Sequence, residues 1–210
     1  VRCEMVATDG HRLALVTETL HENDGNVLNI EGIIIPRKGL VEIRKLVDGG
    51  DGLVEMGVTE SVCIVRNQES MLRLSLVEAS YPDYRRVIPT DRGVEVKIEK
   101  HRILQSLRRM SVMSTELFSG VIISLVGGKM KLNSTNPDVG EANEELEVEC
   151  KDGSFSVGYN VRYLIDSIDS MDGELISFEM RSNGGPGVIR VPGKESHLCI
   201  VMPIKIERNL

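Results

Sequence analysis

The feature that most constrains the fold of this chain is a divergent internal repeat. A shift of 124 positions aligns residues 40–49 with 164–173, and a shift of 127 aligns residues 8–10 with 135–137. A repeat of this period predicts two copies of one small domain rather than a single large one. The alternative, a chance similarity between two amphipathic segments rich in strands, stays open on this observation alone.

The two copies are unequal in length. The second runs from about Gly93 to Ile206 and is expected to contain a strand, a helix, strands, a second helix and further strands. The first copy has no counterpart of the segment from Gly93 to about Gly127. We therefore expect the chain to begin in the middle of a domain, which fits its starting with Val1 rather than with Met.

Short runs of alternating apolar and polar residues predict antiparallel hairpins. Asp-Gly and Gly-Gly pairs follow these runs, and both pairs tolerate the positive φ angles that a type I′ turn needs at its two central positions. The expected hairpins are residues 5–15 around Asp9-Gly10, residues 122–132 around Gly127-Gly128, and residues 147–157 around Asp152-Gly153.

Three segments change to a period of 3.6 residues, which predicts helices over 36–47, 100–113 and 160–171. Pro36 suits a first helical turn, and Asn160 suits an N-cap. The glycines expected to end the first and third helices are Gly49, Gly50 and Gly173. The side chains expected on the apolar faces are Leu40, Ile43, Leu46 and Val47, then Ile103, Leu107 and Met110, and finally Leu164, Ile168 and Met171.

The joint between the two copies, residues 80–89, contains Pro82 and Pro89. Each proline restricts its own backbone and that of the residue before it. We therefore expect this joint to be a stiff, extended linker.

The charge of the chain is unevenly distributed. The formal net charge is −7, yet the predicted helices over 36–47 and 100–113 carry +3 and +4, which leaves −14 for the rest. A basic helical surface on an acidic body is typical of a protein that touches phosphate with one side and repels it elsewhere. A solvated helix face is the alternative, and the third predicted helix, with a balance of −1, weakens the pattern.

Several classes of protein are excluded by what the sequence lacks. It has no window of 18 apolar residues and no signal-peptide pattern, so we expect no membrane span and no membrane partner. Its four cysteines form no CxxC pair, which indicates a reduced, cytoplasmic setting without a zinc ribbon. The absence of Trp weighs against a base-stacking platform for single strands.

Catalytic motifs are also missing. No P-loop, GxSxG, HExxH or GxGxxG motif occurs, and the glutamates clustered over 141–149 lack the spacing of a metal site. His11 lies near Asp9 and could act as a base beside an orienting carboxylate, but no nucleophile accompanies it. We expect no catalytic residue, no metal and no cofactor, with an enzyme that uses Asp9 and His11 as the alternative.

Five ordered segments resemble those of a known family. They are residues 6–14, 35–39, 81–89, 159–164 and 201–206. Together they resemble the bacterial sliding clamp, the beta subunit of DNA polymerase III, over essentially the whole chain. The resemblance implies an α+β fold of repeated clamp-type domains, with antiparallel sheets outside and two helices per complete domain inside. It also implies a parent protein with three such domains per subunit that forms a homodimeric ring.

The resemblance implies domain boundaries as well. Residues 1–83 would be part of the middle domain without its N-terminal portion, and 84–89 would be the linker. Residues 90–206 would be the last domain, and 207–210 a tail beyond the usual end of the family. The first domain would be absent, so we do not expect this chain alone to close a ring.

The function implied by the resemblance is that of a processivity factor in DNA replication. The parent ring would encircle duplex DNA without reading its sequence. The replicative DNA polymerase, the clamp loader and repair polymerases would insert peptides of the Gln-Leu-x-Leu-Phe type into a cleft between the middle and last domains. The alternative is a truncated, clamp-like interaction module that binds such peptides without encircling DNA.

Carried over position by position, the implied cleft has an apolar floor for Leu and Phe anchors, and its methionine can repack for varied partners. The floor would consist of Leu13, Val87, Ile200, Met202 and Ile204. Its residues would be Thr8, Gly10, His11, Arg12, Leu13, Pro82, Arg86, Val87, Tyr163, Ile200, Met202, Pro203 and Ile204. The residues implied to face DNA are Lys38, Arg102 and Arg109. The chain departs from the family at Ile204 and Lys205, where Met and Arg are commoner, and at Gly187, where a small polar residue is common.

Overall fold

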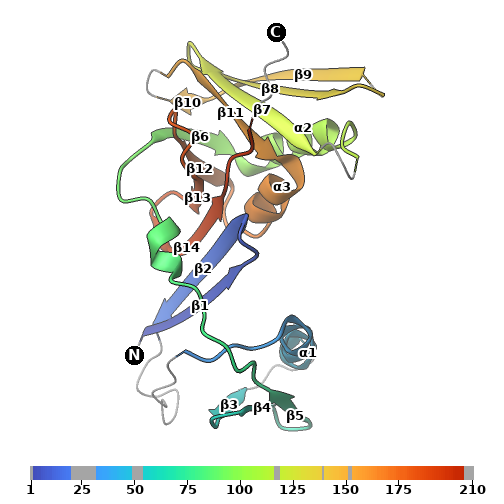
Figure 1. The fold of residues 1–210 in the computed structure, drawn as a ribbon, viewed down its shortest axis with the longest axis vertical. Helices are drawn as coiled ribbons and strands as arrows, with labels where there is room; N and C mark the ends of the chain where they lie inside the picture. Colours follow the sequence, from blue (N-terminus) through green and yellow to red (C-terminus); the bar gives the residue numbers. More distant parts are fainter. Residues whose placement is uncertain are drawn as a thin grey trace. The chain divides into compact units, whose positions relative to one another are not determined.

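The structure of the chain, a computed structural model, describes residues 2–19, 32–48, 54–115, 119–138, 140–150 and 153–205. It divides into two compact units, which are described separately (Figure 1). The larger unit comprises Arg2–Leu20 and Arg85–Leu210, and the smaller comprises Val1 and His21–Tyr84. The expected helix stop at Gly49 and Gly50, the turn residue Asp152 and the tail over 207–210 lie outside the described residues.

A seven-stranded antiparallel sheet forms one layer of the larger unit. Its strand order is β1-β2-β14-β13-β12-β6-β10, so the hairpin at the start of the chain continues the sheet built by the end of the chain. The strands are β1 (Arg2–Thr8), β2 (Arg12–Thr19), β14 (Lys194–Val201), β13 (Gly187–Val191), β12 (Leu175–Met180), β6 (Val94–Glu99) and β10 (Glu149–Cys150).

A four-stranded antiparallel sheet forms the second layer of the larger unit. Along its strand β7, Val121, Ile123 and Leu125 are buried and alternate with more exposed residues, as expected when one face of a strand meets a core. In order, its strands are β11 (Phe155–Asn160), β7 (Gly120–Val126), β8 (Lys129–Asn136) and β9 (Gly140–Glu147).

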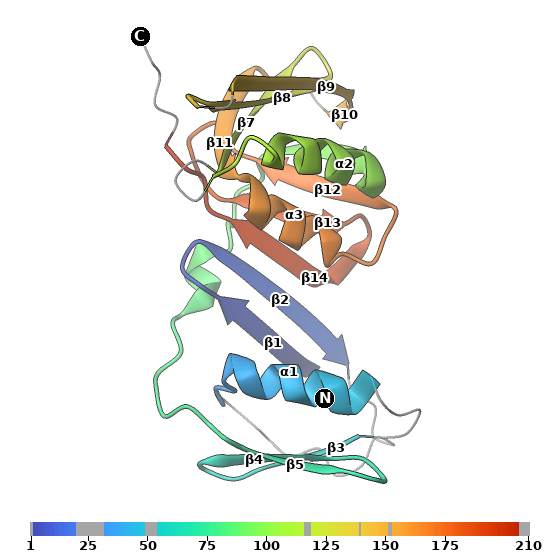
Figure 2. The ribbon, with the colours of Figure 1, turned by 90° about the vertical axis from the view of Figure 1, so that its right-hand side faces the viewer.

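Two helices, α2 (Lys100–Ser111) and α3 (Val161–Asp169), pack against each other and against strands of both sheets (Figure 2). Their six expected apolar side chains are all buried in one shared core, which confirms the predicted faces: Ile103, Leu107, Met110, Leu164, Ile168 and Met171.

The predicted N-cap of α3 is confirmed. The side-chain oxygen of Asn160 accepts hydrogen bonds from the backbone N–H groups of Arg162 and Tyr163, at 3.0 and 3.3 Å. These two groups would otherwise lack partners at the start of the helix. The expected stop at Gly173 is wrong, because the helix already ends at Asp169.

The smaller unit contains α1 (Arg37–Asp48) and the meander β3 (Glu55–Val58), β4 (Val62–Arg66) and β5 (Met71–Ser75). Gly39 is the buried residue of α1, because the helix backbone approaches β5 closely there. A Cβ atom on Gly39 would lie 3.1 Å from Leu74. The predicted apolar face is only half-buried at Leu40, and Val47 is 44% exposed.

The same order of elements follows α1 and α3, as the internal repeat predicts. A three-stranded meander comes after each helix, β3-β4-β5 in one unit and β12-β13-β14 in the other. The structure places the hairpin β1–β2 in the larger unit, because β2 pairs with β14 from Val16↔His197 to Arg12↔Val201. The boundaries expected from the sequence assign that hairpin to residues 1–83, and those boundaries stay a prediction.

The expected turns have different outcomes. Gly127 and Gly128 both have positive φ, 57° and 74°, as a type I′ turn requires. At the first hairpin the central residues are instead Gly10 and His11, since Asp9 N–H donates to the Arg12 carbonyl and only Gly10 of this turn has a positive φ. The type I′ turn at Asp9-Gly10 is therefore wrong by one position.

The third expected hairpin, over 147–157, is also wrong. Strand β10 pairs with β6 in the seven-stranded sheet, while β11 pairs with β7 in the other sheet. The expected extended linker over 80–89 contains a short 3-10 helix, η2 (Tyr84–Val87). Arg85 of η2 forms an ion pair with Glu4 of β1 at 3.3 Å, which ties η2 to the hairpin.

Candidate functional site

Two segments that are far apart in the sequence meet at the turn between β1 and β2. In the ladder between β2 and β14, Leu13 lies opposite Ile200. Beyond the last strand residue, the backbone N–H of Met202 donates to the carbonyl of His11 at 2.8 Å. We call Thr8–Leu13, Tyr163 and Ile200–Ile204 together the hairpin site.

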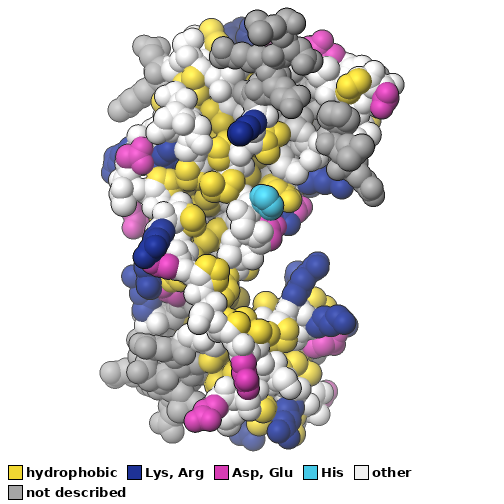
Figure 3. All heavy atoms as spheres, viewed as in Figure 1, with side chains coloured by type: hydrophobic (Ala, Val, Ile, Leu, Met, Phe, Trp, Pro, Cys, Tyr) yellow, Lys and Arg dark blue, Asp and Glu magenta, His cyan; other side chains and the backbone are white. Residues whose placement is uncertain are grey.

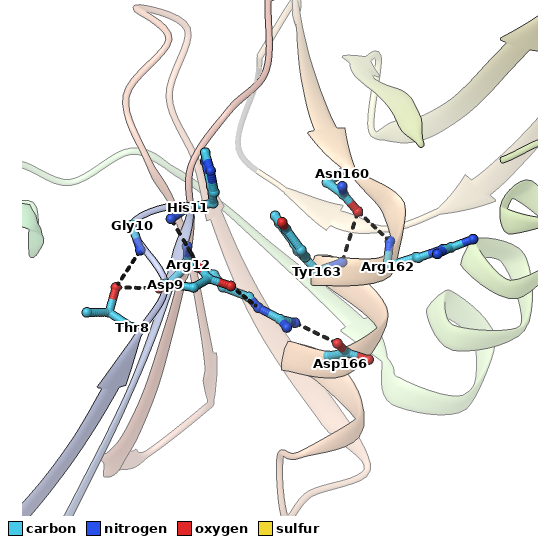
Figure 4. Close-up of polar contacts among 9 residues, drawn as sticks. All are labelled: Thr8, Asp9, Gly10, His11, Arg12, Asn160, Arg162, Tyr163 and Asp166. Carbon is cyan, nitrogen blue, oxygen red and sulfur yellow. Dashed lines mark hydrogen bonds and ion pairs between the residues drawn. The ribbon is translucent and has the colours of Figure 1, made fainter. Parts of the chain in front are cut away.

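The turn of the hairpin site is held by its own polar side chains (Figure 4). The Asp9 carboxylate accepts the backbone N–H groups of His11 and Arg12, both at 3.0 Å. The Thr8 hydroxyl accepts from Gly10 N–H at 3.2 Å and donates to the Arg12 carbonyl at 2.7 Å. Burial raises the pKa of Asp9, but the two N–H groups and the Arg12 guanidinium outweigh it, so this pKa lies below its ordinary value.

Arg12 connects the turn to α3. Its Nε donates to Asp9 at 3.0 Å, and its Nη1 donates to Asp166 of α3 at 2.6 Å. Its guanidinium carbon lies 4.5 Å from the centre of the Tyr163 ring, within the range of a cation–π contact. Burial lowers the pKa of Arg12, but the hydrogen bonds to Asp166 and Asp9 raise it on balance.

The His11 ring stacks on the ring of Tyr163. Its centroid lies 6.3 Å from that of Tyr163, with 24° between the ring planes. The expectation that His11 belongs to a binding surface is compatible with this place, since its side chain is exposed. Among the described residues, the side chains of Asp9 and His11 contact backbone N–H groups, Arg12 and Tyr163, and none of these contacts is a nucleophile that His11 could activate.

Two of the five predicted floor residues, Leu13 and Ile200, lie on the face of the sheet that points away from the main core. Leu13, Ile200 and Val188 stand opposite one another across β2, β14 and β13. They alternate with core residues such as Cys199, and side chains of successive residues point to opposite faces. All three are at most 4% exposed, so this part of the floor is covered. Sequence reasoning missed Val188, because strand register cannot be read from one strand alone.

The other three predicted floor residues are exposed and belong to the C-terminal segment and to η2. Met202 is 36% exposed, Ile204 is 42% exposed and Val87 is 41% exposed. Ile204 is held in place because its N–H donates to the Gly158 carbonyl at 2.8 Å. Hydrophobic side chains gather over β14 and β2 on the face that Figure 3 shows.

The remaining predicted cleft residues are less closely tied to the turn. Arg86 is exposed in η2, and Pro203 is half-buried within the C-terminal segment. Pro82 belongs to the smaller unit, so the structure does not place it relative to the hairpin site.

The three residues predicted to face DNA have different surroundings. The side chain of Arg102 in α2 is exposed and has no hydrogen bond or ion pair to any described residue, and Lys38 is exposed on α1 of the smaller unit. Arg109, in contrast, forms a bidentate ion pair with Glu144 of β9, in which Nη2 lies 2.9 Å from Oε2. The hydrogen bond to Glu144 raises the pKa of Arg109 and lowers that of Glu144. The charge of Arg109 is therefore already balanced within the chain.

Other kinds of site find no support in the described part of the chain. The described residues include no cluster of three or more His, Cys, Asp or Glu side chains suited to a metal ion. No described helix has both the length and the apolar character needed to cross a bilayer. A hollow beside the start of α2 contains none of the predicted site residues and is lined by Glu99, Lys100, His101, Leu104, Gly173 and Glu174.

Comparisons with known proteins place this geometry among sliding clamps. A family model of the DNA polymerase III beta subunit, C-terminal domain, matches residues 85–205, and the model of its central domain matches residues 2–83. Among curated relatives, the beta sliding clamp of Pseudomonas putida is 28% identical over 203 residues, covering 96% of this chain and 54% of the relative. That of Escherichia coli K12 is 28% identical over 201 residues, with the same shares covered.

Solved structures agree with these matches. The C. crescentus beta sliding clamp, solved with PEG, has a TM-score of 0.91 and 28% identity over 98% of this chain and 54% of that chain. A sliding clamp from Bartonella birtlesii, bound to griselimycin, has a TM-score of 0.89 and is 29% identical. The match covers 98% of this chain and 55% of that chain. The expected resemblance and the α+β clamp fold are thus confirmed. The chain spans about half the length of the curated relatives that it matches.

Proposed function

Because this chain belongs to the family of the DNA polymerase III beta subunit, we propose that it works as part of a sliding clamp and that its hairpin site binds a short peptide of partner proteins. The parent clamp encircles duplex DNA as a homodimeric ring in the cytoplasm. It tethers the replicative polymerase, the clamp loader and repair polymerases, and it catalyses no reaction.

The observation that carries the proposal is the joining of two distant segments into one small surface. The ladder between β2 and β14 brings Leu13 opposite Ile200, and the bond from Met202 N–H to His11 extends that ladder past the last strand residue. A rigid polar turn thus lies beside the exposed apolar side chain of Met202. This combination suits a peptide that has both apolar anchors and polar backbone groups.

The rigidity of the turn favours binding. A surface that is already ordered before binding loses less conformational entropy when a peptide is held. The buried row of Leu13, Ile200 and Val188 supports the site from below. Met202, unbranched and partly exposed, can repack around Leu or Phe anchors of a Gln-Leu-x-Leu-Phe segment.

A fluorescence-polarisation titration tests the peptide site. The probe is a labelled Gln-Leu-Asp-Leu-Phe peptide, and the control peptide carries Ala in place of both Leu residues and Phe. We expect saturable binding of the probe and none of the control, because the apolar anchors supply the contact. Equal binding of the two peptides, or no binding of either, would contradict the proposal.

A second candidate is an interaction module that binds the same peptides without encircling DNA. It is favoured by the ion pair between Arg109 and Glu144, which removes one of the positive charges expected to face phosphate. The first candidate retains Arg102 for this role, since among the described residues it has no charged partner. DNA contacts through such side chains are independent of sequence and weaken with salt.

A further inference from the structure

We propose that Asp166 of α3 is a positioning residue of the hairpin site, which holds the Arg12 guanidinium over the ring of Tyr163 and so fixes the turn before a peptide arrives. The inference rests on the proposed function of that site. Asp166 is not among the residues that the family resemblance implies, and it stands out only through its contact with Arg12.

The geometry separates two kinds of contact made by Arg12. The bond from Nε to Asp9 is local, because the two residues are three apart in one turn. The bond from Nη1 to Asp166 spans 154 positions and joins the turn to α3. Asp9 thus shapes the turn, whereas Asp166 directs the guanidinium toward the helix.

The direction of the Arg12 guanidinium is important because Tyr163 lies beside Asp166 on α3. Tyr163 precedes Asp166 by three positions, so both side chains lie on one side of α3. The guanidinium lies 4.5 Å from the centre of the Tyr163 ring, and the His11 ring stacks on the same tyrosine. A carboxylate at Asp166 therefore brings two consecutive turn residues, His11 and Arg12, onto one aromatic side chain.

The contact between Asp166 and Arg12 also influences the apolar part of the site, because the backbone connects the turn to Met202. His11, whose ring contacts Tyr163, accepts the N–H of Met202 through its carbonyl. If Arg12 leaves α3, the turn loses its ion pair to the helix, and the place of Met202 becomes less defined. Since ordering of the site during binding costs free energy, a looser turn binds a peptide more weakly.

The chain offers a matched control on the same helix. Asp169 follows Asp166 by three positions and pairs with Arg108 of α2 at 3.3 Å, away from the hairpin. The two aspartates are exposed to almost the same degree, 60% and 59%. Asp166→Asn and Asp169→Asn therefore remove the same charge from similar surroundings, and only the first affects Arg12.

The experiment compares these two variants in the titration with the labelled Gln-Leu-Asp-Leu-Phe peptide. We expect Asp166→Asn to raise Kd by about three- to tenfold, in line with the loss of a partly shielded ion pair and a weakened cation–π contact. Asp169→Asn is expected to stay within about twofold of the unchanged chain, because its partner lies outside the site. Asp166→Glu, which keeps a carboxylate, should restore most of the affinity.

A spectroscopic readout separates positioning from general destabilisation. The Arg12 Nε–H signal in a ¹H–¹⁵N spectrum, identified by its absence in Arg12→Lys, should be shifted by the ring current of Tyr163. We expect Asp166→Asn, but not Asp169→Asn, to reduce that shift while the thermal unfolding midpoints of both variants remain alike.

The outcomes distinguish this inference from the proposed function. If the unchanged chain binds the peptide and both variants bind it equally well, the role of Asp166 is contradicted and the peptide site stands. An Arg12 signal that is the same in both variants would also overturn it. If the unchanged chain does not bind the peptide, the proposed function fails, and the inference fails with it.

Discussion

At the scale of single residues, Gly187 occupies a place in the core with no room for a side chain. A Cβ atom there would lie 2.8 Å from Phe178 and 2.9 Å from the Tyr159 hydroxyl oxygen. Both rings are buried and lie with their centroids 5.5 Å apart, so neither can move away easily. Burial, slightly opposed by the charge of Arg181, raises the pKa of Tyr159 well above its ordinary value, and the hydroxyl remains neutral.

Replacement Gly187→Ala is therefore expected to destabilise the larger unit. The added methyl group overpacks a dense core, which costs about 1–3 kcal/mol. Urea denaturation followed by circular dichroism measures the loss. Gly57→Ala is the control, because among the described residues no atom beyond its two chain neighbours lies within 4 Å of a Cβ atom built on that strand glycine. An equally stable Gly187→Ala variant would show that the rings can shift.

Asp9 provides a pH-dependent prediction. Its pKa in the folded chain lies below the ordinary 3.8, so its contribution to stability is present above that value and is lost as the pH falls through the lower, folded value. We expect the chain to be more stable than Asp9→Asn at pH 6, by less than about 1 kcal/mol because solvent screens an exposed pair.

The measurement is the difference between the two thermal midpoints from pH 6 to pH 2. This difference should shrink in the acid range, where the carboxylate of the unchanged chain becomes protonated. Taking the difference removes the effect of the other acidic groups, which both proteins share. A difference between the two midpoints that stays constant down to pH 2 would contradict the role given to the ionised Asp9.

Two ion pairs show what the sequence could not reveal at this scale. Asp166 contacts Arg12 across 154 positions, and Glu144 pairs with Arg109, one of the residues implied to face DNA. Both pairs arise from packing between elements that are distant along the chain. The turn residues Thr8–Leu13 were predictable because they form one continuous motif.

At the scale of elements, the helices were predictable because local signals agree with tertiary packing. The period of 3.6 placed α2 and α3, and Asn160 marked the start of α3. The hairpin expected over 147–157 was wrong because here the local signal disagrees with tertiary packing. Its two halves pair with β6 and β7, which lie earlier in the chain, and partner choice of this kind leaves no local pattern.

The cap of α3 leads to a prediction for this element. Asn160→Ala removes the acceptor for two backbone N–H groups and is expected to cost about 0.5–2 kcal/mol. Glu99→Ala is the matched control, since Glu99 occupies the N-cap of α2 without a capping hydrogen bond from its side chain. Chemical denaturation should therefore show a loss for Asn160→Ala only. Equal losses for both would contradict the assigned cap.

At the scale of the whole molecule, the proposed peptide site and the residues proposed to face DNA lie on different elements. The repeat in the sequence predicted two related units, and the structure shows the same helix-and-meander order in each. The seven-stranded sheet was not predictable, because the joining of β2 to β14 depends on segments at opposite ends of the chain.

The DNA-facing surface yields a prediction for a full-length clamp that contains this chain. Arg102→Glu should shorten retention on nicked circular DNA more than Arg109→Glu does, because Glu144 already balances Arg109. Neither change should alter binding of the Gln-Leu-Asp-Leu-Phe peptide. Equal effects on retention would show that Arg109 leaves Glu144 when DNA is present, and no effect of either would remove both from the DNA contact.

The most direct test of the central claim is a map of where the peptide binds. The measurement is a ¹H–¹⁵N spectrum of the labelled chain during titration with unlabelled Gln-Leu-Asp-Leu-Phe. We expect shifts concentrated at Thr8–Leu13, Tyr163 and Ile200–Ile204, while the signals of the meander β3-β4-β5 stay unchanged. Shifts centred on that meander, or beside the start of α2, with the hairpin site unaffected would contradict it.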